Sequence, residues 1–237
     1  MAMRADFAIH HALRGFGLDY ESALEMLRSA DEGLTKEDKD RRDIIVAAID
    51  NLVDFAVAEE YQMATELPDF EELDEEKKEV CEAIFAKYNN RYALIENKDI
   101  EYAMIIAAQL VAISNQTVLT YMTQGDERVR PWHLQYEGFS APKSQFPGWL
   151  VPPIEHACRC YLVEDSVIGK TPADVQGAVV NVPEMPDWFN PTFKECVAFG
   201  GRIFSDAHPY FQVDPLHEPI LQDIASRIKS KYFKWQE

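Results

Sequence analysis

Prolines divide this chain into two stretches that cannot share one kind of secondary structure. They recur from Pro131 to Pro219, whereas apolar residues at helical spacing run through the residues before about position 120. Proline removes a backbone donor and clashes with the preceding helical turn, so long helices are excluded from the second stretch. The sequence therefore predicts an α+β protein, with a helical region over residues 1–120 and a compact α+β region over residues 121–237.

Apolar spacing and helix-end signals locate the expected elements within these two regions. Thr35 followed by Asp38 has the form of a capping box, and Pro68 ends the helix that begins there. Helices are expected over residues 19–30, 35–67, 74–88, 99–122 and 219–233. Short strands are expected over residues 160–163, 178–182 and 202–204.

Charge and composition limit the kinds of partner. Hydrophobic residues make up 47% of the 237 residues, which is enough to form a globular core. The formal charge is −18, and residues 1–120 carry most of it, with 26 acidic and 12 basic residues. The richest basic cluster is only residues 39–42, so we expect weak or no autonomous DNA binding. An acidic surface of this kind would repel packaged DNA, complement a basic protein partner, or simply be solvated.

Cysteine content and hydropathy indicate a cytoplasmic protein without a membrane anchor. Four cysteines in a chain of this length are too few for a disulfide framework, and the N-terminus lacks the form of a secretion signal. The longest apolar run, residues 102–113, is too short to span a bilayer and is interrupted by Gln109.

Two cysteines and a histidine form the candidate metal site. On an extended segment Cys158 and Cys160 point to the same face, and the glycine- and proline-containing loop upstream can bring His133 beside them. These are ligand types for a structural zinc, and the possible fourth ligands are His156, Cys196 and His208. The competing interpretation is a pair of buried thiols beside a core histidine. No arrangement of nucleophile and base stands out, so we expect no enzymatic activity.

The same part of the chain carries a resemblance to a known family. Its residues are Asp126-Glu127-Arg128-Val129-Arg130-Pro131-Trp132-His133, then Gly138, Trp149, Pro152-Pro153 and Cys158-Arg159-Cys160. This order resembles the signature of the Mu F-like phage head-morphogenesis family, also called minor capsid proteins. Thr192 departs from that pattern, because it replaces the glycine of an Asn-Pro-Gly that is frequent in the family.

The resemblance implies a Mu F-like domain over residues 121–237 and a bacteriophage virion protein. Such proteins accompany the portal protein and other head proteins in multiple copies. They occupy the host cytoplasm during assembly and the capsid interior or portal vertex afterwards, acting in head assembly, genome packaging or ejection. The alternatives are a metal-dependent nuclease or hydrolase effector carried in the virion, with Glu155 or His156 as base, and an adaptor that uses zinc only to hold a loop. Four protein ligands on the metal would favour structure, and three plus water would favour catalysis.

Overall fold

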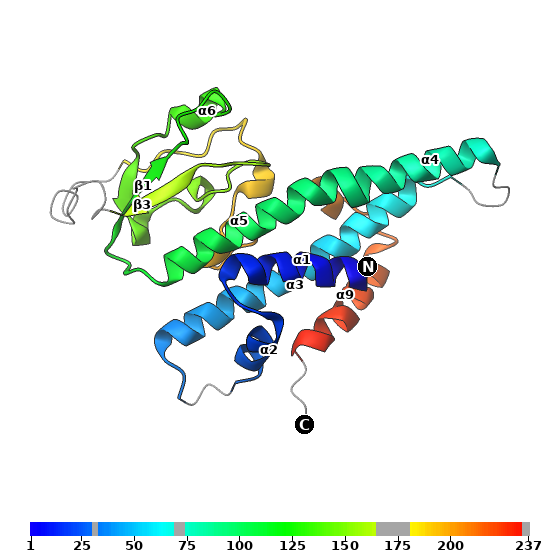
Figure 1. Ribbon diagram of the computed structural model, residues 1–237, viewed down its shortest axis with the longest axis horizontal. Helices are drawn as coiled ribbons and strands as arrows, with labels where there is room; N and C mark the ends of the chain where they lie inside the picture. The colour runs from blue at the N-terminus through cyan, green and yellow to red at the C-terminus, as the bar shows by residue number, and fades with distance from the viewer. Residues whose placement is uncertain (30–32, 69–73, 165–180, 234–237) are drawn as a thin grey trace.

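The computed structural model describes residues 1–29, 33–68, 74–164 and 181–233, and in them the chain is mostly helical with one small sheet (Figure 1). The helices are α1 (Ala2–Phe16), α2 (Tyr20–Arg28), α3 (Lys36–Glu66), α4 (Glu75–Ala86), α5 (Ala93–Val111), α6 (Pro131–Leu134) and α9 (Glu218–Phe233). The strands are β1 (Val118–Met122), β2 (Ser140–Pro142) and β3 (Tyr161–Glu164). The general α+β class is therefore confirmed.

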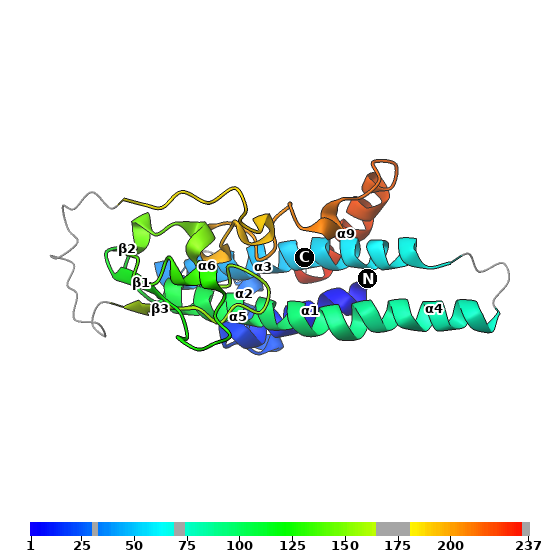
Figure 2. The same cartoon turned by 90° about the horizontal axis from the view of Figure 1, so that it is seen from above.

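A helical hairpin runs along the long axis of the molecule. Helix α4 passes through a π-helical turn, Lys87–Tyr92, into α5, and this continuous rod lies alongside α3 (Figure 2). Helix α1 packs against both α5 and α3. At Gly15 the backbones of α1 and α5 come so close that a Cβ atom would lie 2.2 Å from the carbonyl oxygen of Glu101. Only glycine permits this approach.

Helix α3 is the element around which the rest of the chain is arranged. Thr35 and Asp38 form the predicted capping box, and the helix ends at Glu66 with Leu67 as its C-cap. Its apolar residues are buried on more than one side, because α1, α5, α9 and the short helical turn Pro209–Phe211 all contact it. It is consequently a central helix and not a surface one.

The sheet lies at the end of the molecule away from α4 (Figure 1). Its order is β2-β1-β3, and both pairs are antiparallel, with Thr120 opposite Ser140 on one side and Val163 on the other. Leu119 and Tyr121 of the central strand are completely buried. This small sheet supports the loops that carry the candidate metal residues.

The second stretch of the chain returns to the helices and shares their core. Buried Asn51 of α3 accepts hydrogen bonds from the backbone N–H groups of Ile203 and Phe204, each at 3.0 Å, and donates to the Phe204 carbonyl at 2.9 Å. One cluster of buried side chains runs from α1 through the sheet to α9. The division at residue 120 thus marks a change of secondary structure along the chain, and the two stretches pack together.

Several expected elements differ from those observed. The helix expected over 99–122 is wrong at both ends: α5 begins at Ala93 and ends at Val111, and residues 118–122 form β1. Residues 202–204 are not a strand: the side chain of Asn51 bonds the backbone of Ile203 and Phe204, and the carboxylate of Glu195 accepts the N–H of Arg202. The strand expected over 178–182 falls largely outside the described residues. None of the helices in the described ranges combines the length and the apolarity needed to cross a membrane.

Candidate metal centre

The structure brings His133, Cys158 and Cys160 together in a buried cluster, the His133 group. The Nδ1 atom of His133 lies 3.2 Å from the Cys160 sulfur and 3.9 Å from the Cys158 sulfur. All three potential ligand atoms lie within 4.8 Å of one another. Tetrahedral zinc, with bonds of about 2.3 Å to sulfur and 2.0–2.1 Å to nitrogen, holds its ligand atoms roughly 3.5–3.8 Å apart. The three side chains therefore fit a zinc ion after small adjustments.

Local structure explains how these side chains meet. His133 lies on the single-turn helix α6, which starts with Pro131. Proline suits the first position of a helix, because the N–H there has no acceptor within the helix. The cysteines lie in the extended segment that leads into β3, and Tyr102 of α5 donates a hydrogen bond to the Cys160 carbonyl. Helix α5 and the sheet thus fix the cysteine segment beside α6.

Glu155 orients the imidazole from its other side. Its carboxylate lies 3.2 Å from His133 Nε2, 3.1 Å from the indole nitrogen of Trp132 and 3.1 Å from Arg130. In the tautomer that suits this contact, Nε2–H donates to Glu155. Nδ1, the ring nitrogen nearer the sulfurs, then carries no proton, as a metal ligand requires. A carboxylate behind a histidine is the usual outer contact of a zinc-bound imidazole.

The two thiols have unequal proton affinities. A hydrogen bond between the two cysteines lowers the pKa of Cys160 and raises that of Cys158. The buried Tyr121 hydroxyl, which makes no regular hydrogen bond with any described residue, lies beside Cys160 and lowers its pKa further, as do the charges of Arg130 and Arg159. Of the two thiols, Cys160 therefore loses its proton more readily, and the thiolate is the form that binds a metal.

The three candidates for a fourth ligand lie elsewhere. His156 pairs with the buried carboxylate of Asp99, which lies 2.9 Å from its Nδ1 atom. His208 is packed among aromatic rings, where burial lowers its pKa to about 3, and its Nδ1 accepts the N–H of Tyr210 at 3.2 Å. Cys196 lines a separate small cavity beside Pro152 and Ile203. None of these three joins the His133 group.

The arginines of the motif hold the surrounding loops. Arg159 forms a forked pair with Asp126, at 2.6 and 2.8 Å, and Arg130 donates to the carbonyl of His156 at 2.7 Å. These contacts tie the turn at Asp126 and Arg130 to the segment that contains His156 and the cysteines. Gly138, with a φ of 81°, donates its N–H to the Tyr121 carbonyl and closes the same unit against β1.

Access to the group is narrow. The cavity next to it has a volume of about 10 Å³ and is lined by Arg128, Arg130 and Arg159 as well as by His133 and Cys160. Such a space is about the size of one water molecule. The cavity has room for a water molecule and is too small for a larger substrate.

Two residues of this centre were not expected from the sequence. The sequence predicts a helix at Tyr121, and β1 has no apolar–polar alternation that would indicate a strand and so its position next to Cys160. Asp99 was seen only as a helix start, yet its carboxylate accepts from the backbone N–H of Ala157 at 2.8 Å and pairs with His156. The positive φ of 55° at Ala157 is held in part by this contact.

Comparison with protein-family models, with curated proteins and with solved structures finds no match. The resemblance to Mu F-like proteins therefore rests on the motif residues, and the geometry around them bears on function independently.

Proposed function

We propose that this chain is a bacteriophage minor head protein with a Mu F-like C-terminal region and a helical region that docks on the portal protein or other head proteins. The observation that supports it is that the residues carrying the resemblance make one connected unit. Asp126 pairs with Arg159, Arg130 and Trp132 contact Glu155, and His133 meets both cysteines. Contacts among the members of the signature are what a functional motif would require, and they support the proposal.

In this proposal the metal has a structural role, and zinc is the ion that the donors suit. Two sulfurs and one imidazole nitrogen select zinc over the hard cations, which prefer oxygen. His133, Cys158 and Cys160 would hold it, with Glu155 behind the imidazole. Bound zinc would fasten α6 to the segment entering β3, two parts of the chain separated by 24 residues between His133 and Cys158.

The alternative is a metal-dependent nuclease or hydrolase effector, and one observation favours it. Only three ligands gather among the described residues, and a catalytic zinc keeps an open position. Against it stands the cavity of about 10 Å³, which leaves no room for a substrate. Glu155 is also engaged by Arg130, Trp132 and His133, so it is not free to act as a base. The structural role is therefore preferred.

Presence in the particle tests the proposed function. Purified virions of the phage that encodes this chain should contain it, detected by mass spectrometry together with the portal protein. The ratio of its peptides to portal peptides should stay constant through a density gradient. A chain found only in the lysate, and absent from gradient-purified virions, would contradict the head-protein role.

A cleavage assay separates the two functions. The full chain should leave DNA, RNA and peptide substrates intact when zinc, magnesium or manganese is supplied. It should also bind duplex DNA weakly at physiological salt, because a net charge of −18 offers few cations to release counterions. Metal-dependent cleavage that Glu155→Ala abolishes, with the far-UV spectrum unchanged, would establish the effector instead.

A further inference from the structure

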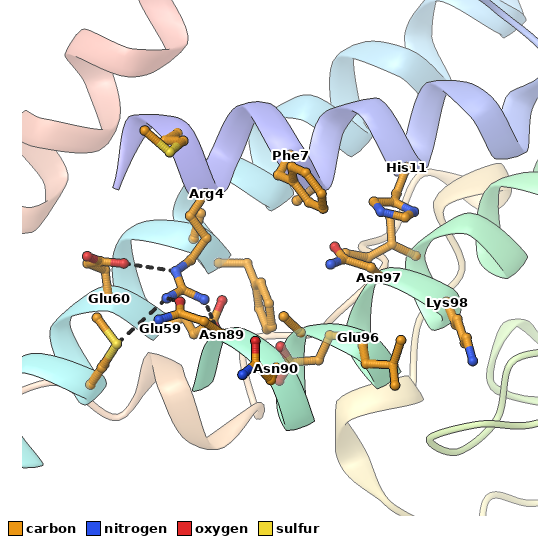
Figure 3. Close-up of a pocket in the computed structure, with 18 of the residues that line it drawn as sticks. Arg4, Phe7, His11, Glu59, Glu60, Asn89, Asn90, Glu96, Asn97 and Lys98 are labelled. Carbon is orange, nitrogen blue, oxygen red and sulfur yellow. Dashed lines mark hydrogen bonds and ion pairs between the residues drawn. The ribbon is translucent and has the colours of Figure 1, made fainter. Parts of the chain in front are cut away.

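A long groove between α1 and the α4–α5 rod, with α3 as its floor, has no occupant among the described residues (Figure 3). Its volume is about 950 Å³, far more than the cavity at the metal centre. The π-helical turn Lys87–Tyr92 forms part of its wall, with Asn89 and Asn90 lining it. Turns of this type interrupt a regular helix at a cost, and they occur frequently at functional sites.

The rims of the groove are apolar and exposed. Phe7 of α1 is 62% exposed and points into the groove from one side, and Leu94 of α5 is 60% exposed on the other. Met3 and Phe85 add further exposed apolar surface along the same walls. A contiguous set of exposed apolar side chains around a hollow marks a surface that another molecule covers.

The inner end of the groove has more carboxyl groups than cations. Arg4 pairs with Glu59 and Glu60, and the N-terminal amine lies 3.8 Å from Glu60. Glu96 is buried as well, but its hydrogen bond comes from the neutral phenol of Tyr210 at 2.8 Å. Lys98 also lines the groove (Figure 3), yet neither it nor any other described cation forms an ion pair with Glu96. The other end is balanced by the pair of Arg14 and Glu101. One buried carboxyl group therefore lacks a cation.

The pKa values of Glu96 and Glu59 are consistent with this shortage of cations. Burial raises the pKa of Glu96, and burial together with the charge of Glu96 raises that of Glu59. Arg4 and His156 oppose the shift at Glu96, while Asp99 adds to it. A carboxyl group that holds its proton for lack of a cation would ionise when a cation arrives.

We propose that this groove binds an amphipathic helix of a partner protein that carries a lysine or arginine on the edge of its apolar face, with the cation reaching Glu96. Such a helix places apolar residues at i, i+3, i+4 and i+7 into an apolar groove between helices. A second copy of this chain fits poorly, because residues 1–120 carry 26 acidic against 12 basic residues and would repel their like. The inference deepens the proposed function, since it names the docking surface of the helical region.

Three matched synthetic helices test the chemistry. Each has about 18 residues, the same leucine stripe and the same glutamine and alanine background, and they differ at one stripe-edge position, which holds lysine, glutamine or glutamate. Fluorescence anisotropy against the full chain at neutral pH measures each Kd. The lysine peptide should bind at least about tenfold more tightly than the glutamate peptide. Saturable binding of none of them, or equal affinity for lysine and glutamate, would overturn the proposal.

Variants of the full chain place the binding in the groove. Phe7→Ser, at an exposed position that leaves the core intact, should weaken all three peptides, and Glu96→Gln should remove the preference for lysine while the leucine contribution remains. Leu216→Ser is the matched control, because Leu216 is also strongly exposed but lies outside the groove. Binding that Leu216→Ser weakens as much as Phe7→Ser does would contradict the assignment.

The outcomes separate this inference from the head-protein role. If the chain is in purified virions but the peptides do not bind, the groove proposal fails and the function stands. If the peptides bind with the predicted preference but virions lack the chain, the groove stands and the function fails.

Discussion

Asn51 shows how one polar residue can determine the position of an irregular segment. It is buried in the middle of α3, and its side-chain amide forms hydrogen bonds with the backbone of Ile203 and Phe204. Residues 202–204 have no strand beside them, so these bonds replace a sheet ladder. Without them, two backbone N–H groups and a carbonyl would be buried without partners.

Replacing Asn51 should therefore destabilise the protein more than the size of its side chain suggests. We expect Asn51→Ala to lower the free energy of unfolding by about 2–4 kcal/mol, because buried backbone groups lose their partners. Gln62→Ala is the matched control: Gln62 also donates to two carbonyls, those of Tyr210 and Gln212, but at a position that water reaches. Urea denaturation of both variants measures the difference. An equal loss of unfolding free energy in both variants would show that the buried hydrogen bonds of Asn51 stabilise the protein no more than the exposed ones of Gln62.

Glu59 and Glu96 should make the protein less stable as pH rises. Burial, as the largest cause, raises the pKa of Glu59 to about 8 and that of Glu96 to about 7, from an ordinary value of 4.5. Between about pH 5 and 8 the folded state then binds more protons than the unfolded state, so stability falls as pH rises. We expect Glu59→Gln to flatten this slope in urea midpoints measured from pH 5 to pH 8. A slope that is unchanged by the substitution would contradict the assignment.

His208 should act in the opposite direction at lower pH. Its folded-state pKa of about 3 lies below the ordinary 6.5, so the unfolded state binds more protons between about pH 3 and 6.5. Stability should consequently fall as pH drops through that range, and His208→Phe should reduce this loss. Urea midpoints from pH 6.5 down to pH 4 measure it, and an identical acid dependence in the variant would exclude His208 as the cause.

At the scale of elements, helix α1 was not predicted and yet forms one wall of the groove. Its N-cap is Met1, whose side chain cannot cap the helix. Buried positions such as Ala5, Ile9, Ala12 and Phe16 do follow helical spacing, so the signal was present in apolar periodicity and absent in capping. Its position on α5 depends on the close approach at Gly15.

We expect Gly15→Ala to destabilise the protein by about 1–3 kcal/mol, because a Cβ atom there would press on the backbone of Glu101, which cannot move away as a side chain could. Gly148→Ala is the matched control, since its nearest neighbour is a ring atom of Phe199 at an ordinary 3.8 Å. Thermal unfolding measured by circular dichroism compares the two. A Gly15→Ala protein as stable as the Gly148→Ala protein would mean that α1 lies further from α5.

Other elements were predictable for identifiable reasons. The capping box at Thr35 and the stop near Pro68 set α3 to within a residue, and the closing helix was expected at 219–233 and found as α9. Strand β1 was mistaken for the end of a helix because a short apolar run after Ile113 carries no periodicity of its own. Only its pairing with β2 and β3 decides its structure, and pairing is not local in sequence.

At the scale of the whole molecule, the two ends have different properties. One end carries the sheet and α6 with the His133 group, and the other carries α4 (Figure 1). The groove lies along α1, α3 and the α4–α5 rod. The shared core between the two ends makes the chain one packed unit. The ligand types of the candidate metal centre could be read from the sequence, because two cysteines at i and i+2 point to one face of an extended segment and the loop upstream can return His133 to them. The sequence could not distinguish a metal site from buried thiols beside a core histidine. The groove could not be read from the sequence, because its walls come from α1, α3 and α5 and meet only in the folded chain.

Whether the His133 group binds zinc is decided by the metal content of the purified full chain, measured by inductively coupled plasma mass spectrometry. We predict about one zinc per chain in the wild type and in Cys196→Ser, since Cys196 lies apart from the group. Cys158→Ser should lose the zinc and unfold at a clearly lower temperature. Wild-type protein that is free of metal and unfolds at the same temperature with and without added zinc would contradict a structural metal at this site.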